Sequence, residues 1–245
     1  MAAGARSRPD AQRIKKAYAD LQQAHDDIKE AHMAIVLRLA IIAEYRDPDT
    51  GAHILRISDY GREVGRAVGL SESELEVYRF ASPLHDIGKI AIPDAILKKK
   101  GKLTAGEFEV MKGHTVIGSR MFDGSKSLIL KAAADICRSH HERWDGTGYP
   151  DKVKGEAIPL FARLVAVVDI FDAVTSKRCY KDAWSFEEGI KYIKTLSGTH
   201  LDPRLVNAFV RSRSRIREVY EANATIQTFI TEYGVLAGKF DARAE

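Results

Sequence analysis

The apolar positions near the start of the chain repeat every seven residues. No Gly or Pro interrupts residues 12–46. A heptad seam of this kind predicts a long helix over residues 12–43 that pairs in parallel with the same helix of a second copy. The alternative is an amphipathic helix that packs its seam against its own domain. The seam consists of Ile14, Leu21, Ile28, Ile35 and Ile42, and alanines follow three positions later at Ala17, Ala24 and Ala31.

The rest of the apolar pattern has a helical period. Asp47-Pro48 ends the first helix, because the residue before a proline is pushed out of the helical conformation. Ser71 with Glu74, and Thr104 with Glu107, are capping boxes that begin helices. No series of alternating strand-like segments appears, so the fold class is all-α. Helices are expected over residues 52–68, 71–80, 104–122, 127–142, 160–174, 185–196 and 203–221, with one more around Leu84, His85 and Asp86.

Composition sets the class of protein. The 245 residues are 45% hydrophobic and 29% charged, and the net charge is +4 with dispersed basic residues. These values are typical of a soluble globular protein and do not indicate binding of a nucleic acid polymer. Two cysteines and the lack of a long apolar run favour the cytoplasm, with no membrane segment in this chain. We expect a disordered leader (1–11), the heptad helix (12–43), a catalytic domain (44–210) and a helical extension (211–245).

Histidines and acids supply the candidate chemistry. His53, His85, His114, His140 and His141 each stand near a helix end or bend. Imidazole combined with carboxylate suits a transition metal, whereas calcium or magnesium prefers oxygen ligands alone. The three remaining histidines, His25, His32 and His200, are interpreted as structural.

The adjacent pairs indicate more than one metal ion. Neighbouring residues of a helix diverge by about 100°, so His85 and Asp86 cannot both face one small ion in the same way. A carboxylate can bridge two ions about 3.5 to 4 Å apart, and Asp86 is the candidate bridge. Asp169 lies within the apolar run LVAVVDIFDAV, where an unpaired charge is costly.

Four motifs together carry a family resemblance. HDIGK, HHERWDGTGYP, VAVVDIFDAVTS and the SGTHLDP turn occur in this order. Over residues 39–210 they resemble the HD-GYP subgroup of the HD-domain phosphohydrolases, bacterial enzymes that hydrolyse cyclic di-GMP.

The resemblance implies an HD-domain helical bundle behind an N-terminal signalling helix. It also implies two or three divalent metal ions, with iron or manganese favoured. The implied ligands are Glu44, which is associated with a third metal, and His53, His85, Asp86, His114, His140, His141 and Asp169.

The resemblance also implies substrate contacts. Lys89 matches the lysine that contacts the scissile phosphate, where a positive charge stabilises developing negative charge. Arg178 and Lys181 match basic positions that hold the phosphates of the ligand. Tyr149 lies beside the guanine-binding cleft in a loop shaped by Asp145, Gly146 and Gly148. The chain departs from the family pattern at Ala52, Lys100, Lys177 and Cys179, which leaves substrate affinity and the shape of the Arg178 loop open.

The expected function is metal-dependent hydrolysis of cyclic di-GMP to linear pGpG, with a second round giving GMP. Asp86 and Lys89 are the expected catalytic residues, and an upstream receiver or sensor would control a homodimer through the heptad helix. One alternative is a non-hydrolytic cyclic di-GMP sensor or protein-interaction module. Another is a related HD hydrolase that acts on other nucleotides, although such an enzyme would normally lack the GYP loop.

Overall fold

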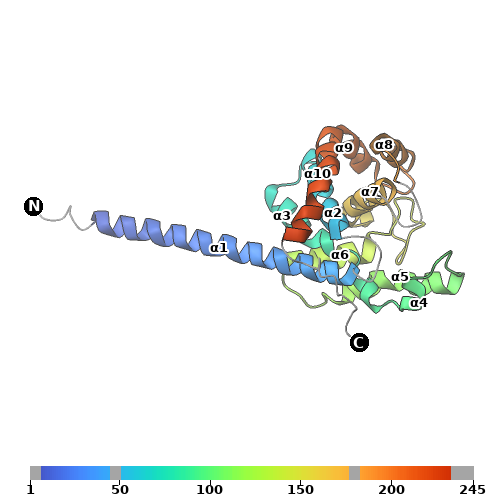
Figure 1. The fold of residues 1–245 in the computed structure, drawn as a ribbon, viewed down its shortest axis with the longest axis horizontal. Coiled ribbons are helices and arrows are strands. Elements are labelled where there is room, and N and C mark those ends of the chain that lie inside the picture. The colour runs from blue at the N-terminus through green and yellow to red at the C-terminus, as the bar shows by residue number, and fades with distance from the viewer. Residues whose placement is uncertain (1–6, 45–50, 177–182, 233–245) are drawn as a thin grey trace, which may run out of the picture.

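The computed structural model describes residues 7–44, 51–176 and 183–232, and within these ranges it contains helices and no strand. The all-α fold class is therefore confirmed. Figure 1 shows a bundle from which one long helix projects. The elements are α1 (Ser7–Glu44), α2 (Gly51–Ala67), α3 (Glu72–Ala81), η1 (Ser82–Leu84), η2 (Ile87–Ala91), α4 (Asp94–Leu97), α5 (Ala105–Arg120), α6 (Leu128–Ser139), η3 (Gly155–Ala157), α7 (Leu160–Thr175), α8 (Phe186–Thr195), α9 (Pro203–Arg211) and α10 (Arg213–Glu232).

Helix α7 lies at the centre of the bundle. It contacts α2, α6, α8 and α9, and Val165, Val167 and Val168 are fully buried in it. The Phe171 ring meets the rings of Tyr60 on α2 and Phe209 on α9 edge to face. An almost continuously apolar helix of this kind is expected where neighbours surround it on all sides. Of the two acids of α7, the Asp172 side chain is buried and the Asp169 side chain is 24% exposed.

Capping boxes begin the helices that the sequence predicts. The Ser71 hydroxyl accepts a hydrogen bond from the Glu74 amide, and Thr104 accepts one from Glu107 in the same way. In both boxes the glutamate accepts from the capping residue's own amide, so two otherwise unpaired donors at each helix start are satisfied. Ser185 and Glu188 form a third such box at α8.

The expected helix around His85 and Asp86 is wrong. These two residues lie between the short 3₁₀ helices η1 and η2, and Asp86 has φ −105° and ψ 9°, outside helical geometry. Pro83 lies in the first turn of η1, and Gly88 allows η2 to pack closely against α5. A tight turn, rather than a helix, therefore presents the two side chains.

Three helix boundaries also differ from expectation. Helix α1 begins at Ser7, five residues before the expected start, because a proline such as Pro9 is tolerated in the first turn of a helix. Helix α6 ends at Ser139, with His140 as its C-cap. The expected helix over residues 203–221 is two helices, since the chain turns at Ser212 and α10 then packs along α2.

The seam of α1 faces solvent along most of the helix. Only the end of α1 joins the bundle, where Ala40 and Ala43 are buried. The exposed fractions are 70% for Ile14, 68% for Leu21 and 55% for Ile28. The alternative in which α1 packs its seam against its own domain therefore does not hold for this part of the helix.

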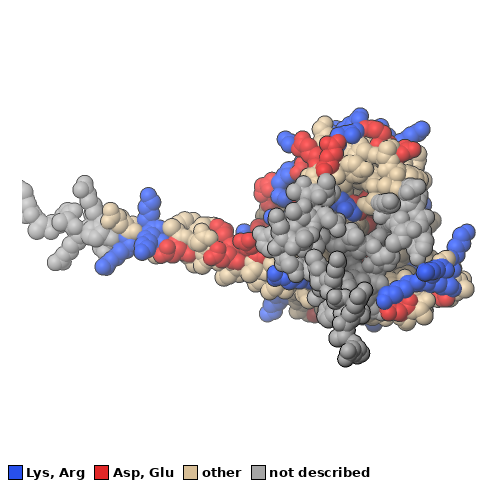
Figure 2. Space-filling model, viewed as in Figure 1, with Lys and Arg blue, Asp and Glu red and all other residues tan. Residues whose placement is uncertain are grey.

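The charged surface is mixed. Lys and Arg side chains gather at the end of α4 and α5 in Figure 2, where Lys98 pairs with Asp94 at 2.9 Å and Lys99 with Glu107 at 2.6 Å. Pairing within the molecule leaves little net field here for a polyanion. Among the described residues, no helix has both the length and the hydropathy needed to cross a membrane.

Candidate metal centre

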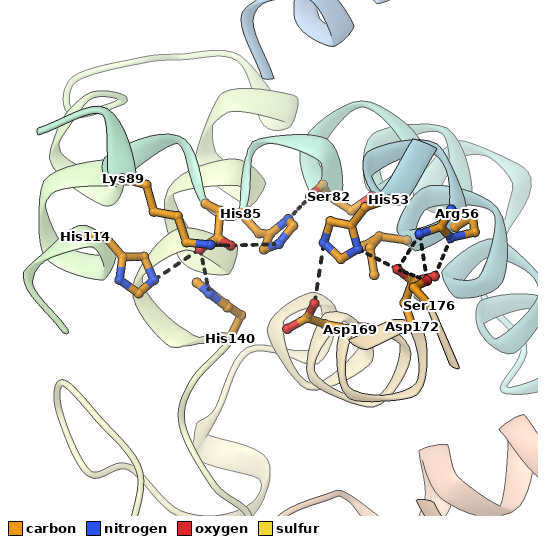
Figure 3. A network of polar contacts seen from close by, with 12 residues as sticks. His53, Arg56, Ser82, His85, Lys89, His114, His140, Asp169, Asp172 and Ser176 are labelled. Atoms are coloured by element: carbon orange, nitrogen blue, oxygen red, sulfur yellow. Dashed lines mark hydrogen bonds and ion pairs between the residues drawn. The ribbon is translucent and has the colours of Figure 1, made fainter. Parts of the chain in front are cut away.

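Seven of the eight predicted ligands come together in two adjacent clusters. The first holds Asp86, His114, His140 and His141, and the second holds His53, His85 and Asp169; within each cluster one ligand atom per residue lies within 4.8 Å of the others. The ring centroids of His85 and His140, one from each cluster, are 5.3 Å apart, and His85 Nε2 lies 3.4 Å from Asp86 Oδ2, so the clusters touch. Figure 3 shows most of these side chains converging from the η1–η2 turn, α2, α5, α7 and the end of α6.

Backbone carbonyls orient three of the histidines. The Nδ1–H of His85 donates to the Ser82 carbonyl at 3.0 Å, and that of His114 donates to Met111 at 2.7 Å. His140 donates in the same way to Ile136 at 2.9 Å. A carbonyl can only accept a hydrogen bond, so each ring carries a proton on Nδ1, and the neutral ring turns an unprotonated Nε2 toward the centre.

A carboxylate orients a fourth histidine, His53. Asp172 lies 2.7 Å from His53 Nδ1, and Arg56 Nη2 donates to the same carboxylate at 2.8 Å. The Nε2 of His53 then faces Asp169 at 3.5 Å. This is the carboxylate–histidine arrangement that fixes a metal-binding imidazole. Burial raises the pKa of Asp172, but the hydrogen bonds from Arg56 and His53 outweigh burial and lower it to about 2.

Asp86 holds the centre of the first cluster. One carboxylate oxygen lies 3.2 Å from His114 Nε2 and 3.5 Å from His140 Nε2, and the other lies 2.8 Å from the Lys89 ammonium. Burial opposes ionisation of Asp86, but Lys89 and His85 outweigh it and hold its pKa well below the ordinary value. A carboxylate with its negative charge among imidazoles is a suitable bridging ligand.

The pKa values of the cluster histidines are shifted in different directions. Burial lowers the pKa of His140, and burial together with His140 lowers the pKa of His141 strongly. For His85, burial disfavours the charged form, but the neighbouring Asp86 carboxylate outweighs it and raises the pKa. Neutral imidazoles are the form that binds a metal ion.

Unsatisfied buried atoms show that the clusters fit a divalent metal. The Nε2 atoms of His85, His114 and His140 and Oδ1 of Asp86 are buried without a hydrogen-bond partner. Buried polar atoms are normally paired, and each such group requires an explanation. Here the orphan atoms converge and are all metal-ligand atoms, so the His/Asp cluster is compatible with binding divalent metals.

The remaining predicted residues fall into two groups. The side chain of Glu44 and all of Arg178 and Lys181 lie outside the described residues, as do Lys177 and Cys179. Lys89 is at the first cluster, and the Tyr149 ring stacks on His141 with centroids 4.8 Å apart. Tyr149 therefore joins the predicted GYP loop to the metal centre.

Hydrogen bonds hold the GYP loop in shape. The Asp145 carboxylate accepts from the Thr147 amide at 2.9 Å and lies 3.2 Å from Arg143 Nη2. Gly146 has φ 83°, and a Cβ on Gly148 would lie 2.4 Å from the Arg143 nitrogen, so both positions favour glycine. The Asp145 amide also donates to the Thr199 carbonyl at 2.8 Å.

Hydrogen bonds from the SGTHLDP turn support the GYP loop. The Trp144 amide donates to the His200 carbonyl at 3.0 Å, and Nη1 of Arg143 lies 3.2 Å from His200 Nδ1. Asp202 caps α9 and pairs with Arg163 at 2.6 Å. His200 thus has the structural position that the sequence indicates.

Sequence reasoning missed several supporting residues. The sequence motifs assign no role to Asp172, the second acid of the apolar run that holds Asp169, or to Arg56. Glu142 is buried, and its Oε1 accepts from the Asp151 amide at 2.6 Å and the Lys152 amide at 2.9 Å, which closes the GYP loop. The available signal was the presence of acids in otherwise buried surroundings, where an unpaired charge is costly.

Replacing Gly88 by alanine is expected to destabilise the domain. A Cβ here would lie 2.0 Å from the His114 carbonyl oxygen and 2.6 Å from the Gly118 nitrogen, both backbone atoms of α5. The free energy of unfolding should fall by about 1–3 kcal/mol, the usual cost of overpacking. Urea unfolding measures the change.

The matched control for Gly88→Ala is Gly106→Ala, in the first turn of α5. A Cβ there meets nothing within 4 Å, so Gly106→Ala should leave the unfolding free energy unchanged or raise it. Equal stability of the two variants would contradict the close packing of η2 on α5.

Comparison with known proteins gives the family. Residues 38–205 match the family model described as HD domain. The chain is 42% identical over 216 residues to the cyclic di-GMP phosphodiesterase response regulator RpfG of Xanthomonas campestris, covering 86% of this chain and 57% of that protein. It is 46% identical over 182 residues to a cyclic di-GMP phosphodiesterase of Thermotoga maritima, covering 74% of this chain and 50% of that protein.

A third relative carries a different substrate in its name. The 3'3'-cGAMP-specific phosphodiesterase 2 of Vibrio cholerae is 42% identical over 180 residues, covering 74% of this chain and 34% of that protein. The chain thus spans between a third and three fifths of the length of these relatives.

A solved structure supports the fold. The cyclic GMP-AMP-specific phosphodiesterase V-cGAP3 of V. cholerae aligns with a TM-score of 0.54 at 25% identity, covering 75% of this chain and 48% of that one. The family follows from the domain match and from these relatives. It also agrees with the HDIGK and HHERWDGTGYP motifs, whose histidines and Asp86 lie at one buried His/Asp centre. The chain belongs to the HD-domain family and, within it, to the HD-GYP group.

Proposed function

We propose that this domain is a metal-dependent phosphodiesterase that hydrolyses cyclic di-GMP to linear pGpG, with GMP as the product of a second round. The observation that carries the proposal is the pair of touching His/Asp clusters, in which Nε2 of His85, His114 and His140 and Oδ1 of Asp86 are buried without a hydrogen-bond partner. The names of the relatives at 42% and 46% identity support cyclic di-GMP as the substrate.

Each side chain has a distinct task in this proposal. The first cluster would hold one divalent ion and the second another, with Asp86 between them and Glu44 as the candidate ligand of a third. Bound ions supply Lewis-acid activation of water and neutralise phosphate charge. Imidazole and carboxylate donors suit iron, manganese, zinc or nickel, and iron or manganese is proposed from the resemblance to the HD-GYP group.

Lys89 is placed to act on the substrate. Its ammonium lies 2.8 Å from Asp86 and its side chain is 17% exposed, so it can meet a phosphate at the edge of the centre. A fixed positive charge here stabilises the charge that develops on the phosphate oxygens. Arg178 and Lys181 are proposed to hold the second phosphate, and Asp145, Gly146, Gly148 and Tyr149 to form the wall toward the base.

The test is a product analysis. Protein purified without oxygen and loaded with iron or manganese is incubated with cyclic di-GMP, and the products are resolved by chromatography. Formation of pGpG supports the proposal. Tight binding without turnover would favour the alternative, a non-hydrolytic sensor or interaction module.

The second candidate substrate is 3'3'-cGAMP, which the 42% identical Vibrio relative favours. The same assay should include it, with both substrates at equal concentration. We expect the higher kcat/KM for cyclic di-GMP. A higher kcat/KM for 3'3'-cGAMP would replace the proposed substrate while leaving the reaction type unchanged.

The proposal includes a homodimer formed through α1, under the control of an upstream receiver or sensor, in the reducing environment of the cytoplasm. Helix α1 is about 57 Å long at 1.5 Å per residue, and its heptad seam is more than half exposed at Ile14, Leu21, Ile28 and Ile35. A lone helix with such a seam is marginally stable in water, whereas a parallel pair buries it. The buried free thiol of Cys137 is in keeping with a reducing compartment.

The double substitution Leu21→Asp with Ile28→Asp is expected to convert the dimer to a monomer, because it places charges in the paired seam. Light scattering at micromolar concentration measures the mass. The control is Ala19→Asp with Gln22→Asp, which adds the same two negative charges at exposed positions outside the seam. A wild-type protein that is monomeric under these conditions would contradict the dimer.

A further inference from the structure

An aromatic corner lies at the outer edge of the metal centre. The rings of Phe108 on α5 and Tyr149 in the GYP loop meet at 79° with centroids 6.1 Å apart. Tyr149 stacks on the cluster residue His141, at 4.8 Å and 29°. The corner is therefore fixed to the metal centre on one side, while Phe108 is 45% exposed on the other.

A lysine lies in this corner. The Lys112 ammonium is 5.4 Å from the Phe108 ring centroid and 5.7 Å from that of Tyr149. Residues 108 and 112 are four apart, so both side chains project from one face of α5. Glu109 holds the ammonium at 2.6 Å, although the glutamate is itself largely exposed. The corner thus combines an exposed phenyl ring and one positive charge beside the two His/Asp clusters.

This combination of an aromatic ring and a lysine fits a guanine base. Aromatic faces bind nucleobases by stacking and accept any base. A lysine adds selectivity, because guanine presents two acceptors at O6 and N7 whereas adenine presents an amino donor in place of O6. Tyr149 stacks on His141, which shares the first cluster with Asp86, so the corner adjoins the place where a phosphate would lie beside Asp86 and Lys89.

We propose that Phe108 and Lys112 complete, with Tyr149, the pocket for the base next to the scissile phosphate, and that Lys112 selects guanine over adenine there. This inference rests on the proposed function, since it needs a nucleotide phosphate at the metal centre. It concerns the specificity of the same site. Phe108 would provide apolar contact area for the base. Lys112 would favour guanine over adenine, the base by which cyclic di-GMP differs from 3'3'-cGAMP.

The test measures binding of GMP and AMP, which carry the base and phosphate but need not be hydrolysed. Calorimetry on metal-loaded protein should show tighter binding of GMP than AMP. Lys112→Met should weaken GMP binding about tenfold, the usual effect of losing one good base contact, and leave AMP binding unchanged. Lys112→Arg should retain the preference, because arginine recognises the same acceptors. Phe108→Leu should weaken the binding of both nucleotides.

The controls separate this inference from the proposed function. Lys191→Met, an exposed lysine on α8, should change neither affinity. Equal loss of GMP and AMP affinity in Lys112→Met, or no loss of either, would overturn the role of Lys112. Turnover of cyclic di-GMP by the wild-type protein tests the proposed function separately: its absence would contradict hydrolysis, while the ratio of GMP to AMP affinity would still decide the role of Lys112.

Discussion

Replacing Asp86 by asparagine is expected to reduce cyclic di-GMP hydrolysis by about 10³-fold or more, since Lewis-acid stabilisation contributes several kcal/mol to the barrier. One carboxylate oxygen faces His114 and His140, and the other faces Lys89. No other acid in the described residues lies within 3.5 Å of both imidazoles and the lysine. Loss of its charge should therefore weaken metal binding as well as turnover.

Two measurements check the Asp86→Asn prediction. Metal content by mass spectrometry should fall below that of the wild-type protein, and the rate of pGpG formation should fall with it. The matched control is Asp135→Asn, an exposed acid on α6 outside both clusters, which should leave metal content and rate unchanged. Asp86→Asn protein that retains wild-type turnover would show that Asp86 is neither bridge nor ligand.

The helices could be predicted from the sequence where local signals decide the structure. The capping boxes at Ser71 and Thr104 fix their helices within the first turn. The η1–η2 turn could not be predicted, because the apolar pattern around Leu84 is equally suited to a helix. The turn depends on the contact of Gly88 with the backbone of α5, which is distant in sequence.

The metal centre was predictable from motifs, but its support was not. The doublets His85-Asp86 and His140-His141 can be recognised in the sequence by their residue types. The orienting groups do not, because the carbonyls of Ser82, Met111 and Ile136 belong to the backbone and carry no side-chain signal. The aromatic corner was missed for a related reason: Phe108 and Tyr149 are far apart in sequence, and only packing brings them together.

Asp172→Ala is expected to cost about 3–5 kcal/mol of unfolding free energy, the usual result when one partner of a buried ion pair is removed. The Asp172 side chain is 2% exposed and that of Arg56 is 12% exposed, so the arginine would be left in the interior without its carboxylate. His53 would lose the group that fixes its Nδ1 proton at 2.7 Å. Metal affinity should fall by about 10–100-fold, as for other residues that orient a ligand.

The Asp172 carboxylate also gives a pH dependence with a defined sign. Its pKa is about 2 in the folded protein, because the hydrogen bonds from Arg56 and His53 outweigh burial. The ordinary value is about 3.9, so the unfolded chain takes up the proton first as the pH falls. The stabilisation is therefore complete above pH about 4 and is lost as the pH falls toward about 2. Asp172→Asn should remove this contribution to acid unfolding.

Asp202→Ala is the control that separates orientation of His53 from general stability. Asp202 is also buried and paired with an arginine, Arg163 at 2.6 Å, but it caps α9 and belongs to neither cluster. Both alanine variants should lower the unfolding free energy, and only Asp172→Ala should lower metal affinity in calorimetric titrations. If the two variants bound metal equally well, Asp172 would be a purely structural partner of Arg56, and the orientation of His53 would have to come from elsewhere.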